Sequence, residues 1–136
     1  MNSNFEIVPA HNLPLAAQAA TFSEAFESYV GGSFAMDAAG LGRFICLQGA
    51  DLCYSSFARN QTGLCGFGYI ARTGDLARLA RLAWCRRRAA LALRGLLLHL
   101  LEEARARRDR MMVLEMIEQN PRIFPQRSAV AGLKYR

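Results

Sequence analysis

The chain has 136 residues and a formal net charge of +6, from 17 basic and 11 acidic side chains. This length supports one domain with a proper core and is too short for two domains of ordinary size. The 52% hydrophobic content holds no apolar run long enough to span a bilayer, because Arg94 and His99 interrupt the richest stretch. The first residues do not resemble a secretory signal, so we expect a cytoplasmic protein with no membrane partner.

The N-terminal third predicts a strand followed by two helices. Residues 5–8 form a short strand that Pro9 closes, and apolar residues at helical spacing predict a helix over residues 13–28. A glycine-containing break at residues 29–33 follows. Asp37 then stands where its carboxylate can cap a second helix.

The middle of the chain alternates between apolar and polar residues, as strands do. Segments 52–59 and 64–72 are predicted strands, and the residues between them, 60–63, are typical of a hairpin turn. Gly74 and Asp75 mark a second turn. A third strand of this meander is predicted over residues 76–84.

After residue 85 the pattern changes directly from strand to helix. Arg86, Arg87 and Arg88 precede an amphipathic helix predicted over residues 89–108. The first N–H groups of such a helix have no partner within it, and together with the helix dipole they favour an anion. A strand over residues 111–117 would complete a right-handed βαβ unit. The predicted apolar stripe of the helix consists of Leu93, Leu97, Leu100, Leu101 and Ala104.

The cysteines and histidines do not predict a metal site. No Cys-x-x-Cys pair occurs, and neither histidine stands at ligand spacing from a cysteine. We therefore interpret all four cysteines as free thiols that are buried as small hydrophobic residues in a reducing compartment. These cysteines are Cys46, Cys53, Cys65 and Cys85.

The arginines of the strand-helix junction leave open a second interpretation, a basic adaptor that binds nucleic acid. Aromatic residues do not interleave with these arginines, and no helix-turn-helix or RNA-binding sheet motif occurs. Glu102, Glu103 and Asp109 also dilute the positive patch. Nucleic acid is therefore not the partner we expect.

The order of these elements resembles that of the GNAT superfamily of acetyl-CoA-dependent N-acetyltransferases, over nearly the whole chain. Residues 79–84 are similar to the fourth strand of that family, residues 100–107 to the end of its third helix, and residues 113–121 to its fifth strand and the asparagine that follows. The resemblance implies an α/β fold in which helices flank a central mixed sheet, within a single domain spanning residues 1–136. The family's last two strands are largely missing, so either the chain is shortened or a second copy supplies the edge in a homodimer.

The resemblance also implies an acetyl-CoA site. Main-chain groups of Leu82, Ala83 and Trp84 would contact the pantetheine arm, and Asn120 would support it. The pyrophosphate turn has two possible registers. One begins at Arg88 and places Leu91 and Leu93 at the family's glycine positions, and the other begins at Arg87 and places Ala90 and Ala92 there. We prefer the second, because alanine preserves the N–H cradle with little steric cost. The turn residues implied are Arg87, Arg88, Ala89, Ala90, Leu91 and Ala92.

The acceptor implied is a primary amine of a small molecule or a protein. Tyr29, Phe34 and Glu115 would contact it, Glu118 would remove its ammonium proton, and Ser128 would protonate the leaving thiolate in place of the family's tyrosine. The missing glycines and tyrosine leave open a catalytically impaired binding module as an alternative to the enzyme.

Overall fold

The computed structural model describes residues 5–26, 35–85, 89–114 and 134–135, and the side chains among them except those of residues 89–92, 114 and 134–135. A six-stranded mixed sheet runs through its centre, with the strands in chain order. The first four strands pair with one another in antiparallel order, the fifth is parallel to the fourth, and the last is antiparallel to the fifth. The strands are β1 (Phe5–Pro9), β2 (Ser56–Asn60), β3 (Gly63–Thr73), β4 (Leu76–Trp84), β5 (Met111–Leu114) and β6 (Lys134–Tyr135).

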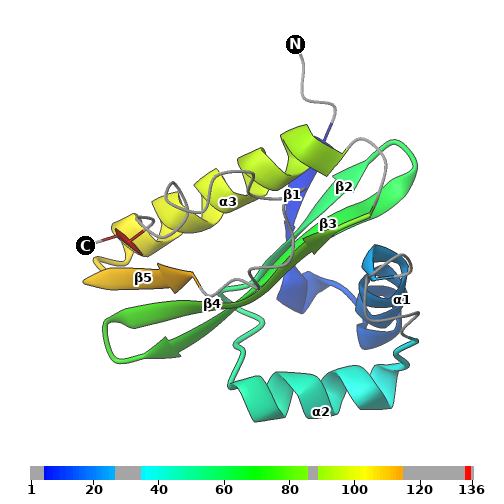
Figure 1. Cartoon of the computed structure of the whole chain (residues 1–136), viewed down its shortest axis with the longest axis horizontal. Helices are drawn as coiled ribbons and strands as arrows, with labels where there is room; N and C mark the ends of the chain where they lie inside the picture. The colour runs from blue at the N-terminus through cyan, green and yellow to red at the C-terminus, as the bar shows by residue number, and fades with distance from the viewer. Residues whose placement is uncertain (1–4, 27–34, 86–88, 115–133, 136) are drawn as a thin grey trace.

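Helices cover both faces of the sheet. α1 (Leu15–Ala25) and α2 (Ala38–Gln48) lie on one face, and α3 (Ala89–Ala106) crosses the other (Figure 1). A short 3-10 helix, Ala10–Asn12, joins β1 to α1. None of the helices in the part of the chain that is described is both long and apolar enough to span a membrane. The mixed sheet with flanking helices confirms the predicted fold class.

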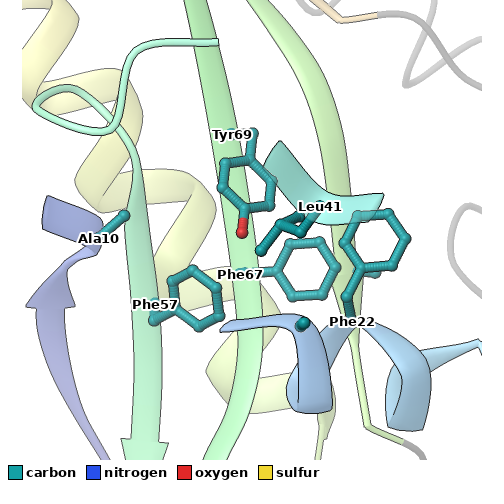
Figure 2. Close-up of a cluster of buried hydrophobic side chains, with 8 residues drawn as sticks. Ala10, Phe22, Leu41, Phe57, Phe67 and Tyr69 are labelled. Carbon is teal, nitrogen blue, oxygen red and sulfur yellow. The ribbon is translucent and has the colours of Figure 1, made fainter. Parts of the chain in front are cut away.

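The core on the α1/α2 face is aromatic. Phe22, Phe57, Phe67 and Tyr69 converge there with Leu41, as Figure 2 shows. The rings of Phe22 and Phe67 stack with centroids 5.1 Å apart, a contact that adds to the free energy from buried area. The Tyr69 hydroxyl donates to Gln18 Oε1 (2.8 Å), and burial raises the pKa of this phenol above its ordinary value.

The start of α2 confirms the predicted cap. Asp37 Oδ1 accepts a hydrogen bond from the Gly40 N–H at 2.7 Å, and Met36 packs on the same core as Leu41. At the other end, Arg78 Nη2 from β4 donates to the main-chain oxygen of Gln48 at 2.6 Å. A cation at a helix C-terminus satisfies a carbonyl that the helix leaves unpaired, so Arg78 ties α2 to the sheet.

Two predicted boundaries are wrong. β2 begins at Ser56 and not at residue 52, because Asp51 organises a turn before it. Its carboxylate accepts from the Cys53 N–H (2.9 Å), and its main-chain oxygen accepts from the Ser55 hydroxyl (2.7 Å). α1 ends at Ala25, where Phe26 closes the last turn, and the rest of the predicted helix lies outside the described residues.

The hairpin turn between β2 and β3 agrees with the prediction. Asn60 Oδ1 accepts from both the N–H and the hydroxyl of Thr62, at 2.8 and 2.6 Å. Gly63 follows with φ +124°, a conformation that L side chains rarely adopt. The second turn has Gly74 at φ 63°.

The buried stripe of α3 is shifted from the predicted one. Leu96, Leu100 and Ala104 are buried against the sheet, whereas the predicted Leu93, Leu97 and Leu101 are half-buried at its margins. The sequence alone did not distinguish Leu96 from its neighbours, because leucines stand at three successive positions, 96–98, and again at 100 and 101. Only the packing against the sheet selects the innermost ones.

The approach of α3 to the sheet depends on Gly68 in β3. A Cβ at this position would lie 2.5 Å from Leu100 Cδ1. We expect Gly68→Ala to lower the free energy of unfolding by about 1–3 kcal/mol, because the added methyl group overpacks this layer. Gly42→Ala in α2 is the matched control, since nothing lies within 4 Å of its Cβ. Better helix propensity should make that variant up to about 1 kcal/mol more stable. Urea denaturation measures the free energy of unfolding of both variants. If Gly68→Ala is as stable as the native protein, the close approach of α3 is contradicted.

The cysteines divide into two classes, which corrects the prediction that all four are buried. Cys65 and Cys85 are buried, whereas Cys46 and Cys53 are exposed, and all four are free thiols. Burial raises the pKa of the Cys65 thiol. The exposed pair lies on α2 and on the Asp51 turn, where the backbone faces solvent.

A buried carboxylate joins three parts of the chain. Asp109, whose side chain is fully buried, accepts hydrogen bonds from Arg72 of β3 (Nε to Oδ1, 3.0 Å, with Nη2 also in contact) and from Arg107 (Nε 3.1 Å and Nη2 2.9 Å, both to Oδ2). Both guanidinium groups lie over the Tyr54 ring, at 5.1 and 4.6 Å from its centroid. Asp109 raises the pKa of Arg72 through this hydrogen bond. The cluster fixes the end of α3 onto the sheet.

Candidate functional site at the edge of β4

β4 and β5 pair along only part of their length. Their parallel register runs from Leu76, opposite Met111, to Leu79, opposite Leu114. β4 continues to Trp84, whereas the described part of β5 ends at Leu114, as Figure 1 shows. Within the part of the chain that is described, the second half of β4 therefore has a strand partner on one side only.

A β-bulge occurs in β4 where this pairing ends. Tyr69 of β3 lies opposite Arg81, but the next residue, Ile70, lies opposite Leu79, so Ala80 is an extra residue in β4. A bulge shifts the alternation of side chains by one position. Ala80, Arg81 and Ala83 therefore all meet the α1/α2 face, whereas Leu82 packs on the α3 face.

The hydrogen-bond pattern shows which main-chain groups are directed away from β3. The Cys85 N–H donates to the Cys65 oxygen at 2.7 Å, and antiparallel pairs alternate between bonded and non-bonded. By this alternation Ala83 exchanges its bonds with Phe67, which it faces in the register. The N–H and C=O groups of Leu82 and Trp84 are directed to the opposite side. We call these groups of Leu82 and Trp84 the open edge of β4.

The open edge ends close to the N-terminus of α3. β4 stops at Trp84, and α3 begins at Ala89. Ala89, Ala90, Leu91 and Ala92 form the first turn of α3, whose N–H groups have no partner within the helix. The structure therefore places an extended strand edge and a helix N-terminus in succession, which suits a ligand with an extended arm and an anionic group.

Most of the other predicted site residues lie outside the described residues. This holds for both arginines of the preferred pyrophosphate turn, for the two catalytic candidates, for Asn120 and for the acceptor contacts. These residues are Arg87, Arg88, Glu118, Ser128, Asn120, Tyr29, Phe34 and Glu115. Of the three predicted strand residues, Leu82 and Trp84 form the open edge, and Ala83 directs its main-chain groups to β3.

Arg81 lies beside the open edge of β4 and is not among the residues that the sequence analysis predicted for the site. Its half-buried side chain extends over the rings of Phe44 and Phe26, 5.4 and 5.8 Å from their centroids. In a strand without a bulge, Arg81 would share a face with Leu79, toward α3. The sequence carries no plain signal of the bulge, because Ala80 looks like an ordinary strand residue.

No described group resembles a metal centre. Among residues 5–26, 35–85, 89–114 and 134–135, no three His, Cys, Asp or Glu side chains gather as ligands would. His99, which the sequence left without a role, pairs with Glu103 one turn along α3 at 3.3 Å.

The partly paired fourth and fifth strands, the bulge, the helix order and the long third helix belong to a fold that this chain shares with solved structures of GNAT acetyltransferases. No family model matches the sequence, and no curated protein matches it significantly. Solved structures, in contrast, match over most of the chain, at identities that show the fold alone.

Three of these structures illustrate the match. The ribosomal-protein-S18-alanine N-acetyltransferase of Escherichia coli is 18% identical with a TM-score of 0.63, covering 93% of this chain and 72% of that one. The PaiA N-acetyltransferase of Thermoplasma acidophilum, in complex with coenzyme A, is 15% identical with a TM-score of 0.66, covering 90% and 86%. YncA of Salmonella typhimurium, solved with its cofactor acetyl-CoA, is 16% identical with a TM-score of 0.62, covering 94% and 79%.

Proposed function

We propose that this protein is an acetyl-CoA-dependent N-acetyltransferase that acts on a primary amine of a small molecule or a protein. The observation that carries the proposal is the open edge of β4, followed directly by the N-terminus of α3. The structural neighbours with coenzyme A or acetyl-CoA bound support it through their common fold.

The residues of this chain fit such a co-substrate in two places. The N–H and C=O groups of Leu82 and Trp84 are directed where the amides of a pantetheine arm can add as an extra strand. The first turn of α3, with Arg87 and Arg88 before it, is suited to the pyrophosphate. Asn120 is proposed to support the arm.

The proposed reaction is attack of the neutral amine nitrogen on the thioester carbonyl. Glu118 first takes a proton from the ammonium group, which gives the neutral amine. The C–N bond then forms as the C–S bond breaks, Ser128 gives its proton to the leaving thiolate, and the proton that the acetylated nitrogen loses returns to Ser128. Tyr29, Phe34 and Glu115 are proposed to hold the acceptor. An N–H donor beside the acyl oxygen would stabilise the charge that develops there.

Thermal-shift titrations with acetyl-CoA and CoA test the proposal. A ligand at 100 times its dissociation constant stabilises the native state by about 2.7 kcal/mol, so both should raise the melting temperature. The Arg87→Ala/Arg88→Ala double variant should reduce the shift. Thiol release over a panel of amines then measures catalysis. No shift with either compound would refute the proposal.

Two other outcomes of the same titrations identify the alternatives. CoA binding with no thiol release for any amine would indicate a binding module. Stabilisation by a short DNA duplex, falling steeply between two salt concentrations, would indicate a nucleic-acid adaptor.

We also propose that the protein forms a homodimer. We propose further that it is cytoplasmic. The free, exposed thiols of Cys46 and Cys53 suit a reducing compartment. Sedimentation equilibrium measures the mass directly, and a monomer at micromolar concentration would refute the dimer.

A further inference from the structure

The positively charged side chain of Arg81 lies on the face of the sheet that α1 and α2 cover. The β-bulge at Ala80 places its side chain on that face, and its guanidinium lies over two aromatic rings, those of Phe44 and Phe26. Stacking on aromatic faces keeps a guanidinium planar and positioned while its N–H edges stay free to donate. The side chain is therefore oriented in advance.

Within the described part of the chain, one nitrogen of this guanidinium, Nε, lacks a hydrogen-bond partner. Its Nε is buried and has no hydrogen-bond partner, and no described carboxylate forms an ion pair with it. Other arginines of the described chain contrast with this: Arg72 and Arg107 share Asp109, and Arg78 donates to Gln48. Buried polar groups in folded proteins are nearly always paired, so an unpaired one requires an explanation, such as a ligand that binds beside it.

Arg81 lies next to Leu82, at the end of the open edge that is farther along the chain from the start of α3. The pairing of β4 with β5 ends at Leu79, two residues before Arg81, and the open edge begins at Leu82, one residue after it. A co-substrate whose anionic group lies at the N-terminus of α3 extends along β4 from Trp84 back toward this point. Its acyl end then lies nearest to Arg81.

We propose that Arg81 binds the carboxylate of the acceptor, so that the acceptor is an amine that also carries a carboxylate, as an amino acid does. A guanidinium and a carboxylate form two parallel charge-assisted hydrogen bonds, which the two Nη groups at the end of the half-buried Arg81 side chain would donate. This assignment rests on the proposed function, because it takes the acyl end of acetyl-CoA to lie beside Arg81.

The first test measures carboxylate binding without acetyl-CoA. A set of N-acetylamino acids, each paired with its neutral amide, is titrated into the native protein by calorimetry and thermal shift. At least one acid should bind ten-fold or more tightly than its amide, and Arg81→Met should abolish that preference. Arg110→Met is the matched control, because Arg110 is exposed and pairs only weakly with Asp75 at 3.5 Å. No preference in the native protein, or one that Arg81→Met leaves intact, overturns the assignment.

Two further readings separate a binding role from a structural one. Removing an unpartnered polar group should leave Arg81→Met at least as stable as the native protein, since methionine can still pack on both rings. If Arg81→Met does not fold, Arg81→Lys keeps the charge, and it should retain less than a tenth of the preference because it lacks the planar fork. If Arg81→Lys keeps the full preference for acids over amides, two parallel hydrogen bonds from Arg81 are not needed, and the assignment is overturned.

Steady-state kinetics distinguish this inference from the proposed function. With acids and amides as acceptors, Arg81→Met should raise the KM for acids at least ten-fold and leave the KM for acetyl-CoA unchanged. If acetyl-CoA fails to bind the native protein, the proposed function fails, while the carboxylate titration still decides the role of Arg81. An unchanged KM for acids overturns the inference alone.

Discussion

Asp109→Ala is expected to lower the free energy of unfolding by about 3–5 kcal/mol, because it leaves two guanidinium groups facing each other without their shared carboxylate. The Asp109 side chain is fully buried between Arg72 and Arg107. For a chain of this length such a loss corresponds to a fall in melting temperature of roughly 10–20 °C. Since domains are stable by only about 5–15 kcal/mol, the variant should be partly unfolded under mild conditions. Thermal and urea denaturation followed by circular dichroism measure both quantities.

Asp75→Ala is the matched control for this effect. Asp75 also pairs with an arginine, Arg110, but both side chains are mostly exposed and the Nε–Oδ2 distance is 3.5 Å. Exposed pairs of this kind contribute about 0–1 kcal/mol. Equal losses of unfolding free energy in Asp109→Ala and Asp75→Ala would show that burial does not set the contribution of Asp109 to stability.

Trp84→Pro is expected to weaken acetyl-CoA binding at least ten-fold relative to Trp84→Ala. Both variants remove the indole, and only proline also removes the N–H of the open edge. Because that N–H is directed away from β3, the sheet should keep its pairing. Calorimetric titration with acetyl-CoA gives the two dissociation constants, and equal constants would contradict a main-chain contact at Trp84.

Ala83→Pro tests the assignment of strand sides. Its N–H is directed to Phe67 of β3 by the alternation of the ladder. Proline at this position removes a sheet hydrogen bond, at a cost of about 3 kcal/mol or more by analogy with a helix interior. Ala83→Pro should therefore lose more stability relative to the native protein than Trp84→Pro loses relative to Trp84→Ala. The reverse order would show that the open edge is formed by the other residues.

In the proposed site, the two halves of β4 have different roles. Up to Leu79 the strand is held by neighbours on both sides, which makes it a rigid base for the site. Beyond the bulge, in the described part of the chain, it offers main-chain groups on one edge and, on the α1/α2 face, the Arg81 guanidinium, whose Nε has no hydrogen-bond partner. A donor and an acceptor could then meet at the bulge, each bound by a different part of the same strand.

Within the described residues, the sequence by itself determined the elements and their order. The alternation of the β3–β4 meander, the cap at Asp37 and the polar turn at Asn60 are local signals, because each depends on residues a few positions apart. Those signals were sufficient for the fold class and for the junction between β4 and α3. They were less exact where a turn such as that of Asp51 competes with a strand pattern.

Only the tertiary structure decided which groups are available for chemistry. The bulge at Ala80 follows from pairing with β3, the innermost leucines of α3 follow from the sheet beneath them, and the exposure of Cys46 and Cys53 follows from the way their segments lie on the surface. Each depends on contacts between residues far apart in the chain, which composition and periodicity do not encode. For that physical reason Arg81 reads as an ordinary strand arginine in the sequence and becomes a candidate ligand group only in the folded protein.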